Sequence, residues 1–502
     1  MYISYKRGKE GAEYATVMSS KKKDGRVVKE SVIYLGKVVD REKGVYHNRE
    51  RGTFTYDIGT GEYGMPSFEQ IQTNREPLQP KCTLDFGDVY ALSKLMDECG
   101  LSGCIDAMGT GGEDTIKALV LFCTLTDRLG MCNAEDWFEG SYARILYAKA
   151  VLASQRISDA LAILGDERSY RDFMGSYIPL VTGNQGQCVA VDSKGVVNSI
   201  DIGLTQVSNH NGDVNIELRL IMVVQLVTGM PICYRVVPGN IIDAITLTEL
   251  LDQASEMGVN IAFSVIDAGY CTITNMNDLF KRRVNFVTRL KPNMKLYGDM
   301  VREHHDGLES TENRTVYNGR IAYVKRVPCM LTDTYSGYTY IIEDTDRKHQ
   351  DEKNAAQKYE KGEITDSELS EIVESAGIFV LISSYMIPPE EVLGIYYTRQ
   401  CSEQFFDLMN GYANLTPLRA HEEETVRGMV MITFISSALI RTAQIRLKGT
   451  GVTFKTAMLS LRNQKSRIYD GTIYIDEPMR KANVAYRSFN IESPSKLPSP
   501  DV

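Results

Sequence analysis

Six short apolar runs in the middle of the sequence are the feature that most restricts its fold. Each has the length of a β-strand, and they are CVAVD (188–192), LRLIMVVQLV (218–227), ICYRVV (232–237), IAFSVID (261–267), VNFVTRL (284–290) and GIFVLIS (377–383). Three of them follow one another directly, and the later ones are separated by AITLTELLDQASEMG and TITNMNDLFKRR, which have helical spacing. This order predicts an α/β fold built on a mixed sheet.

The segments before this region have different patterns. Residues 1–60 alternate short β-branched and aromatic runs with Gly and Lys, which indicates a small β module. From 87 to 177 apolar residues recur every three or four positions, which predicts a helical domain. The stretch 343–375, with 11 acids and 5 bases, is expected to be a solvated charged excursion, and the tail ESPSKLPSPDV is expected to be disordered.

The charge of the chain is unevenly distributed. The 502 residues hold 56 Lys and Arg against 65 Asp and Glu, a net charge of −9, which excludes a histone-like polycation. Residues 1–56 nevertheless hold 13 bases against 7 acids, and residues 441–487 hold 10 against 3. Together with the basic stretch 281–302, these segments are candidate phosphate-contacting surfaces, although each could simply be a solvated face.

Cysteine spacing and hydropathy exclude several classes. The ten Cys contain no C-x-x-C pair, so a structural zinc site is disfavoured. The N-terminus lacks the apolar core of a signal peptide, which predicts an intracellular, reducing compartment. The longest nearly apolar run, 428–440, is shorter than the roughly 20 residues that a membrane-spanning helix needs, so we expect a buried helix and no membrane association.

Three acidic residues occupy places where a sheet gathers ligands. Asp192 and Asp267 each close a predicted strand, and ligands of open α/β sheets collect at the carboxyl ends of strands. Glu403 lies in the segment GIYYTRQCSEQFFDLMNGYANL, where Tyr396, Arg399, Glu403 and Asn410 would share one face of a single helix. Alone, either Asp could be a helix cap, and Arg399 with Glu403 could be a helix ion pair.

The conjunction of the three carboxylates favours a catalytic metal site. Three carboxylates can hold two Mg²⁺ roughly 3.5–4 Å apart, one activating the attacking oxygen and the other stabilising the leaving oxygen of a phosphodiester. We therefore expect Asp192, Asp267 and Glu403 to converge as catalytic residues and metal ligands. Mn²⁺ is expected to substitute for Mg²⁺.

At these positions the chain resembles a known family. Asp192, the IDAGY block with Asp267, the VTRLK that follows it, and Tyr-x2-Arg-x3-Glu at Tyr396, Arg399 and Glu403 resemble the DDE transposases of bacterial insertion sequences, in the subgroup with the Y-R-E-K signature. The block TPLRAHEEETVRGMVMITFISSALI is similar to the family's helix after the catalytic Glu. The resemblance spans about residues 85–460, and its three separate blocks make it specific.

The resemblance implies a ribonuclease-H-like catalytic core, contacts of Tyr396 and Arg399 with DNA phosphate, and a homodimer that pairs two transposon ends. Arg289 and Lys291 of the VTRLK block are also expected to contact phosphate, and so is Asn410, although it stands where the signature has Lys and cannot supply a cation. The implied parts are a small basic β-rich N-terminal module (1–80), a helical DNA-binding domain (81–185), the first part of the core (186–292), a β-rich insertion with a charged excursion (293–376), the second part of the core with the Glu-bearing helix (377–445), and a basic segment with a disordered tail (446–502).

The family's insertion often offers a Trp that stacks a flipped base. The only Trp of this chain, Trp137, lies far outside the expected insertion. Substitutes by stacking would be Tyr297, Tyr317, Tyr323, Tyr335, Tyr338 and Tyr340, none of which the spacing singles out.

The function that follows is cut-and-paste DNA transposition in the cytoplasm of a bacterium, at the nucleoid when DNA is bound. The partners would be double-stranded DNA of the terminal inverted repeats and of the target. Two alternatives stay open: a catalytically inactive DNA-binding relative that acts as a self-regulator, and a metal-dependent nuclease without strand transfer.

Overall fold

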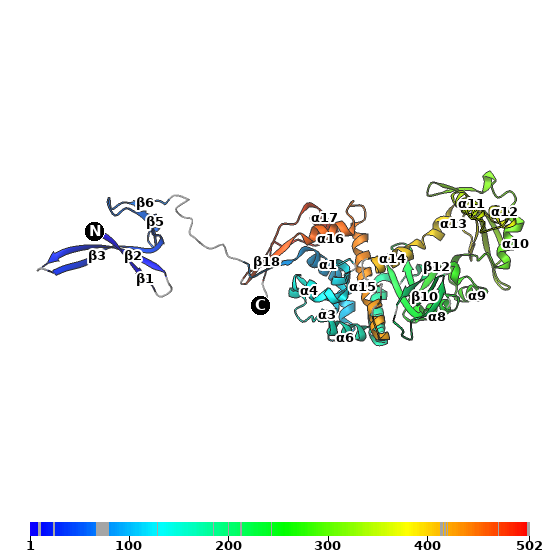
Figure 1. Cartoon of the computed structure of the whole chain (residues 1–502), viewed down its shortest axis with the longest axis horizontal. Coiled ribbons are helices and arrows are strands. Elements are labelled where there is room, and N and C mark those ends of the chain that lie inside the picture. The colour runs from blue at the N-terminus through cyan, green and yellow to red at the C-terminus, as the bar shows by residue number, and fades with distance from the viewer. Residues whose placement is uncertain are drawn as a thin grey trace. The chain divides into compact units, whose positions relative to one another are not determined.

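The computed structural model describes the chain in two compact units, Met1–Pro80 and Lys81–Val502 (Figure 1). The described residues exclude 9–11, 24–25, 67–79, 128, 184, 199, 211–212, 242, 412–414, 416–417, 419, 470 and 499–502. The finer boundaries at 185, 292, 376 and 445 stay predictions.

The first unit is an antiparallel sheet of six strands in chain order. The strands are β1 (Tyr2–Arg7), β2 (Glu13–Lys23), β3 (Arg26–Asp40), β4 (Val45–Asn48), β5 (Gly52–Tyr56) and β6 (Tyr63–Gly64). Alternation along β2 and β3 buries Ala15, Val17 and Leu35 beside Tyr46 and Phe54, and these side chains form the unit's own apolar core. Neighbouring strands in the chain are neighbours in the sheet because short connections favour antiparallel hairpins.

The second unit opens with a short strand, β7 (Cys82–Asp85), and a helical region. The helices are α1 (Gly87–Glu98), α2 (Leu101–Asp106), α3 (Glu113–Leu125), the 3-10 turn η1 (Met131–Asn133), α4 (Ala134–Glu139), α5 (Ala143–Leu146), α6 (Ser154–Leu164) and α7 (Glu167–Thr182). α3 is apolar almost all round and is buried, which is what a helix inside a bundle requires.

A mixed sheet of ten strands forms the middle of this unit. Its strands are β8 (Gln187–Val197), β9 (Gln206–His210), β10 (Asp213–Gln225), β11 (Pro231–Pro238), β12 (Ile261–Ile266), β13 (Asn285–Arg289), β14 (Arg314–Tyr317), β15 (Arg320–Met330), β16 (Ser336–Asp344) and β17 (Ile378–Ser383). The order is β11-β10-β8-β12-β13-β17-β16-β15-β14, with β9 on β10. β8, β10 and β11 are antiparallel, whereas β12 and β13 run parallel to β8.

Helices connect the parallel strands. α8 (Asp243–Glu256) precedes β12, and the 3-10 turn η2 (Ala268–Tyr270) with α9 (Ile273–Lys281) joins β12 to β13. Three antiparallel strands followed by two parallel ones with helical crossovers are consistent with a ribonuclease-H-like fold. The mixed α/β prediction is therefore confirmed.

The expected insertion continues the same sheet. β16 pairs with β17, and β15 and β14 follow, so its three strands lengthen the sheet beyond β13. The insertion also holds α10 (Lys295–His304), the 3-10 turn η3 (Thr311–Asn313), α11 (Thr345–Glu360) and α12 (Asp366–Glu374). The charged excursion forms two mostly exposed helices whose first turns are capped by Asp344 and Thr365.

The C-terminal part of the chain pairs with the first strand of the second unit. α13 (Pro389–Tyr397), α14 (Gln400–Gly411), α15 (Glu423–Leu447), α16 (Phe454–Arg462) and α17 (Arg480–Ser488) are its helices. β18 (Lys465–Tyr469), β19 (Thr472–Ile475) and β20 (Lys496–Pro498) form a four-stranded sheet with β7. The prediction of a disordered tail was wrong for β20, whose backbone pairs with β19.

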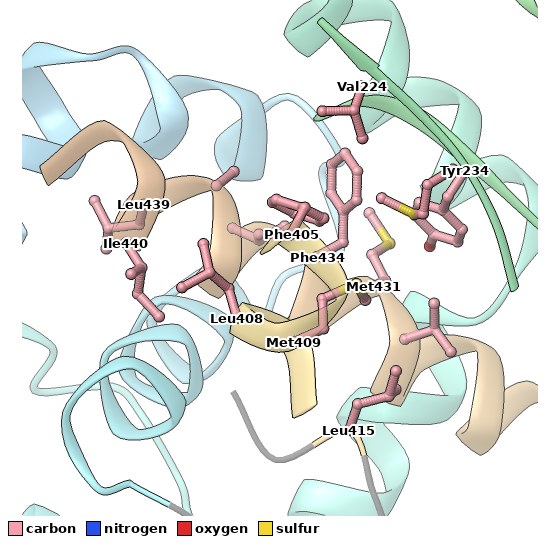
Figure 2. Close-up of a cluster of buried hydrophobic side chains, with 14 of the residues drawn as sticks. Val224, Tyr234, Phe405, Leu408, Met409, Leu415, Met431, Phe434, Leu439 and Ile440 are labelled. Atoms are coloured by element: carbon pink, nitrogen blue, oxygen red, sulfur yellow. The ribbon is translucent and has the colours of Figure 1, made fainter. Parts of the chain in front are cut away.

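α15 is the central helix of the second unit. Its length and composition would suffice to span a membrane, but 72% of its apolar window is buried inside the protein, as expected for a core helix. Phe434 lies 5.5 Å from Tyr177 of α7, 5.0 Å from Tyr234 of β11 and 6.3 Å from Phe405 of α14, measured between ring centroids. Figure 2 shows this cluster, in which α14 and α15 face each other beside the sheet.

Two glycines let α15 and α6 approach closely. A Cβ at Gly428 would overlap the carbonyl oxygen of Leu161, and one at Gly165 would overlap the carbonyl oxygen of Glu424. Only residues without a side chain allow this backbone contact.

We therefore expect Gly428→Ala to lower the free energy of unfolding by about 2 kcal/mol, since overpacking forces the two helices apart. The measurement is urea unfolding of the full chain. The matched control is Gly103→Ala in α2, where a Cβ would meet nothing within 4 Å and helix propensity should add about 0.5 kcal/mol. Equal stability of the two variants would contradict the close approach.

Candidate functional site

The register of β8 and β12 places two carboxylates side by side. These strands are parallel, and Ile266 pairs with Val191, so the residues that follow, Asp267 and Asp192, are neighbours. Asp267 directly follows β12, as predicted. Asp192 was expected to close its strand, but it lies in the interior of β8, because β8 continues along β10 to Val197 after its pairing with β12 has ended.

The third carboxylate comes from a broken helix. The single helix predicted for this segment was wrong: α13 ends at Tyr397 and α14 starts at Gln400, so Tyr396 and Glu403 lie on different helices. Thr398 and Arg399 form the turn between them, where backbone N–H groups donate to carbonyl oxygens three residues earlier. Arg399 therefore projects from the junction, and Glu403 from the first turn of α14.

Arg399 joins the three acids. Its Nη1 lies 3.1 Å from Asp267 Oδ1 and 3.9 Å from Asp192 Oδ2, and its Nη2 lies 3.4 Å from Glu403 Oε1. The three predicted catalytic carboxylates thus converge on one guanidinium. Nε of Arg399 is buried with no hydrogen-bond partner among the described residues, which shows that this guanidinium has donor capacity left over.

Asp192 is the most enclosed of the three acids, since its side chain is 14% exposed, against 52% for Glu403. Burial, and next the charge of Asp267, raise the pKa of Asp192 to about 6, while Arg399 and a hydrogen bond from Ser402 oppose the rise. Ser402 Oγ lies 3.0 Å from Asp192 Oδ2, and the backbone N–H of Ser193 donates to Asp192 Oδ1 at 2.9 Å. Proton occupancy of Asp192 is therefore sensitive to its neighbours near neutral pH.

Sequence reasoning missed Ser402. Its hydroxyl is fully buried and also lies 2.7 Å from the carbonyl oxygen of Arg399, so it ties the turn to Asp192. The sequence offered one signal for Ser402: it follows Arg399 by three residues and directly precedes Glu403.

The turn after β12 is held by two further contacts. The backbone N–H of Gly269 donates to Asp267 Oδ2 at 3.0 Å, so Asp267 also caps η2. Lys291 Nζ donates to the carbonyl oxygen of Gly269 at 3.0 Å. Lys291 thus contacts the turn that directly follows Asp267.

The other residues predicted to bind phosphate differ in how close they lie to the cluster around Arg399. The guanidinium of Arg399 is 5.5 Å from the ring centre of Tyr396, which is buried and whose pKa is raised by that burial. Arg289 ends β13, with its guanidinium 5.1 Å from the Phe379 ring centre. Asn410 lies seven residues beyond Glu403, about 10 Å farther along α14, so it is not part of the cluster around Arg399.

The aromatic residues considered for stacking a flipped base have different surroundings. Tyr317 stacks on Tyr397, the residue after Tyr396, with ring centroids 5.3 Å apart, and Tyr335 stacks on Phe280. Tyr340 is fully buried, and its hydroxyl donates to the carbonyl oxygen of Ile387. Trp137 packs on Phe122 in the helical region, away from these strands. Of these side chains, Tyr317 packs closest to the helix that carries Tyr396.

The donor set suits a hard divalent cation, because carboxylate oxygens are the ligands that Mg²⁺ prefers. Among the described residues, no three acidic, His or Cys side chains are close enough together to share an ion as they stand. At the three candidate acids, the positively charged guanidinium of Arg399 contacts all three carboxylates. Metal binding would require Arg399 to move away and the acids to close in.

One family model covers the part of the chain that holds the candidate site. Residues 187–439 match the family model described as "Transposase DDE domain", which includes all three acids. No curated protein matches the sequence. Among solved structures, the chain is similar to piggyBac transposase in a synaptic complex with hairpin DNA, at 10% identity and a TM-score of 0.39, over 75% of this chain and 70% of that one.

The raised pKa of Asp192 makes a prediction for the metal-free chain. Because its folded pKa of about 6 exceeds the ordinary value of 3.8, ionising Asp192 costs folding free energy, so its contribution to stability falls as pH rises from about 4 to about 6. Asp192→Asn removes this term, and we expect it to be more stable than the wild type above pH 6 by up to about 3 kcal/mol.

The measurement is urea unfolding in chelator from pH 4 to pH 8. The advantage of Asp192→Asn should vanish near pH 4. A ¹³C-carboxyl titration of Asp192 supplies the second readout: its midpoint should rise in Arg399→Gln, and also in Ser402→Ala, since each variant removes a group that lowers this pKa. A pH-independent stability difference would refute this account of the site.

Proposed function

The chain belongs to the transposase DDE domain family, and on that basis we propose that it is a DNA transposase that moves its own insertion sequence by cutting and pasting. The observation that carries the proposal is the convergence of Asp192, Asp267 and Glu403 on Arg399. Tyr396 and Arg399 beside Glu403 favour the Y-R-E-K subgroup of bacterial elements.

The proposed site residues divide into two roles. Asp192, Asp267 and Glu403 would hold two Mg²⁺, or Mn²⁺ in their place, which when bound supply a Lewis acid for the attacking oxygen and another for the leaving oxygen. Arg399 keeps the carboxylates together while no cation is present. When DNA enters, a phosphate offers its guanidinium a new partner, and the acids are released for the cations.

The chemistry consists of two displacements at phosphorus. In the first, the oxygen of water attacks the phosphodiester at the transposon end, and the bond from phosphorus to the 3′-oxygen breaks, which leaves a 3′-OH and a 5′-phosphate. In the second, the 3′-oxygen attacks a phosphodiester of the target, whose own 3′-oxygen leaves. Neither step needs a covalent bond to the protein, so the chain's task is to position the reacting oxygens.

The phosphate contacts follow from the same geometry. Arg399 contacts the carboxylates and the Tyr396 ring, and Lys291 contacts the turn after Asp267. Arg289 lies against the Phe379 ring. We propose that these four contact the backbone near the cleaved bond, whereas Asn410 does not supply a cation. The partners would be the terminal inverted repeats and target DNA. The basic N-terminal unit and helical region would bind the repeats, and a homodimer would pair the two ends.

The test is cleavage of a duplex that carries the inverted repeats flanking the gene, in Mg²⁺. We expect Glu403→Gln and Asp192→Asn to cut at least about 100-fold more slowly than the wild type, because each removes a charge that the transition state requires. Chelation of the metal should abolish cutting by the wild type.

The matched control is Asp407→Asn, which removes an exposed acid one turn along the same helix. It should keep the cutting rate of the wild type. Normal cutting by Glu403→Gln would refute the proposed site. Binding of the repeats without cutting by the wild type would favour the inactive regulator, and cutting without joining to a target would favour the nuclease.

A further inference from the structure

Two adjoining cavities lie beside the helix that carries Glu403. One, of about 250 Å³, is lined by Cys401, Gln404 and Phe405 of α14, and the other, of about 620 Å³, by residues between Ile445 and Phe454 that do not include Arg446. Both are also lined by Arg441 and Gln444 of α15, so these two side chains stand where the cavities meet.

The cavities are positively charged. Arg441 lines both and Lys448 lines the larger one, whereas no Asp or Glu is among the described residues that line either. Arg441 Nε donates to the carbonyl oxygen of Thr228 at 2.8 Å, and its Nη1 to Gln444 Oε1 at 3.3 Å. These neutral acceptors fix the guanidinium without cancelling its charge. The cavities are thus positively charged although the net charge of the whole chain is −9.

The guanidinium lies over a turn that only glycine allows. Gly229 has a φ of +66°, and a Cβ there would overlap Arg441 Nη2. The tight turn after β10 therefore holds Arg441 in place through its backbone, and the arginine is preorganised rather than free to rotate.

The smaller cavity lies across α14 from the candidate active site. The α14 residues that line it centre on a face about 150° around the helix from Glu403. Cys401, which lines this cavity, directly precedes Ser402, whose hydroxyl contacts Asp192. A DNA backbone that crosses α14 after it leaves the carboxylates would meet this positive surface.

We propose that Arg441, with Gln404, Gln444 and Lys448, binds a backbone phosphate of the DNA strand outside the cleaved bond. The inference rests on the proposed function and adds to it a phosphate site beyond the family-like residues around Arg399. Guanidinium and amide N–H groups are the donors that phosphate oxygens prefer. The ligand is the DNA backbone, so the contact should not depend on base sequence.

The experiment measures binding of the full-length protein to a fluorescent terminal-repeat duplex, in chelator and at several salt concentrations. We expect Arg441→Gln to weaken binding about tenfold and to reduce the steepness of the salt dependence by about one phosphate contact. Lys448→Gln should weaken binding in the same way by a smaller factor, and it alters an exposed side chain.

The matched control is Arg446→Gln, which removes the same charge from the same helix, where Arg446 is paired with Glu98 at 2.8 Å. It should bind DNA as the wild type does. Unchanged affinity and salt dependence in Arg441→Gln, or an equal loss in Arg446→Gln, would overturn the proposal. If Arg441→Gln unfolds, Lys448→Gln decides, and unchanged binding by that variant overturns the proposal.

The same binding assay distinguishes failure of the proposed function from failure of the proposed phosphate site. A wild-type chain that does not bind the duplex at all would remove the transposase proposal, whereas a wild type that binds, with variants that bind equally well, removes only the phosphate site. Because the assay contains no metal, it is independent of cutting.

Discussion

The ion pairs of Arg399 are the interaction on which the candidate site depends. Burial makes it costly to ionise Asp192, and repulsion by the neighbouring carboxylate of Asp267 adds to that cost, as the raised pKa of Asp192 indicates. The positive charge of the Arg399 guanidinium, which contacts both aspartates and Glu403, offsets this repulsion. The arginine achieves this because it projects from a turn between two helices, where it can reach a sheet on one side and the first turn of α14 on the other.

The scaffold sets these positions through long-range pairing. Parallel register between β8 and β12 fixes the two aspartates, and the packing of α14 on α15 around Phe405 and Phe434 fixes the helix of Glu403 (Figure 2). The insertion strands extend the same sheet and bring Tyr317 against Tyr397. The geometry of the candidate site therefore depends on core contacts between segments that are 29 to 80 residues apart in the sequence.

Much of this was readable in the sequence. The apolar runs predicted the strands of the mixed sheet, and the end of a strand pointed correctly to Asp267, whereas Asp192 lies inside β8 and not at its end. The break at Thr398 and Arg399 was not readable, because neither residue is a Gly or Pro and the helical spacing continues across it. Ser402 and Arg441 were missed because their roles depend on partners, Asp192 and Thr228, that are distant in sequence. β20 was missed because a polar, Pro-containing tail carries no apolar period, and only β19 gives it a place.

The pairing of β7 with β18 joins residues about 380 positions apart. During synthesis, β7 cannot pair with β18 until nearly the whole polypeptide has been made. The helical region likewise cannot pack against α15 until α15 has been synthesised. A chain that ended before residue 423 would lack both α15 and β18, and the faces of α3 and α6 that α15 covers would stay exposed to solvent. Exposed apolar surface of this kind makes an incomplete chain prone to aggregation.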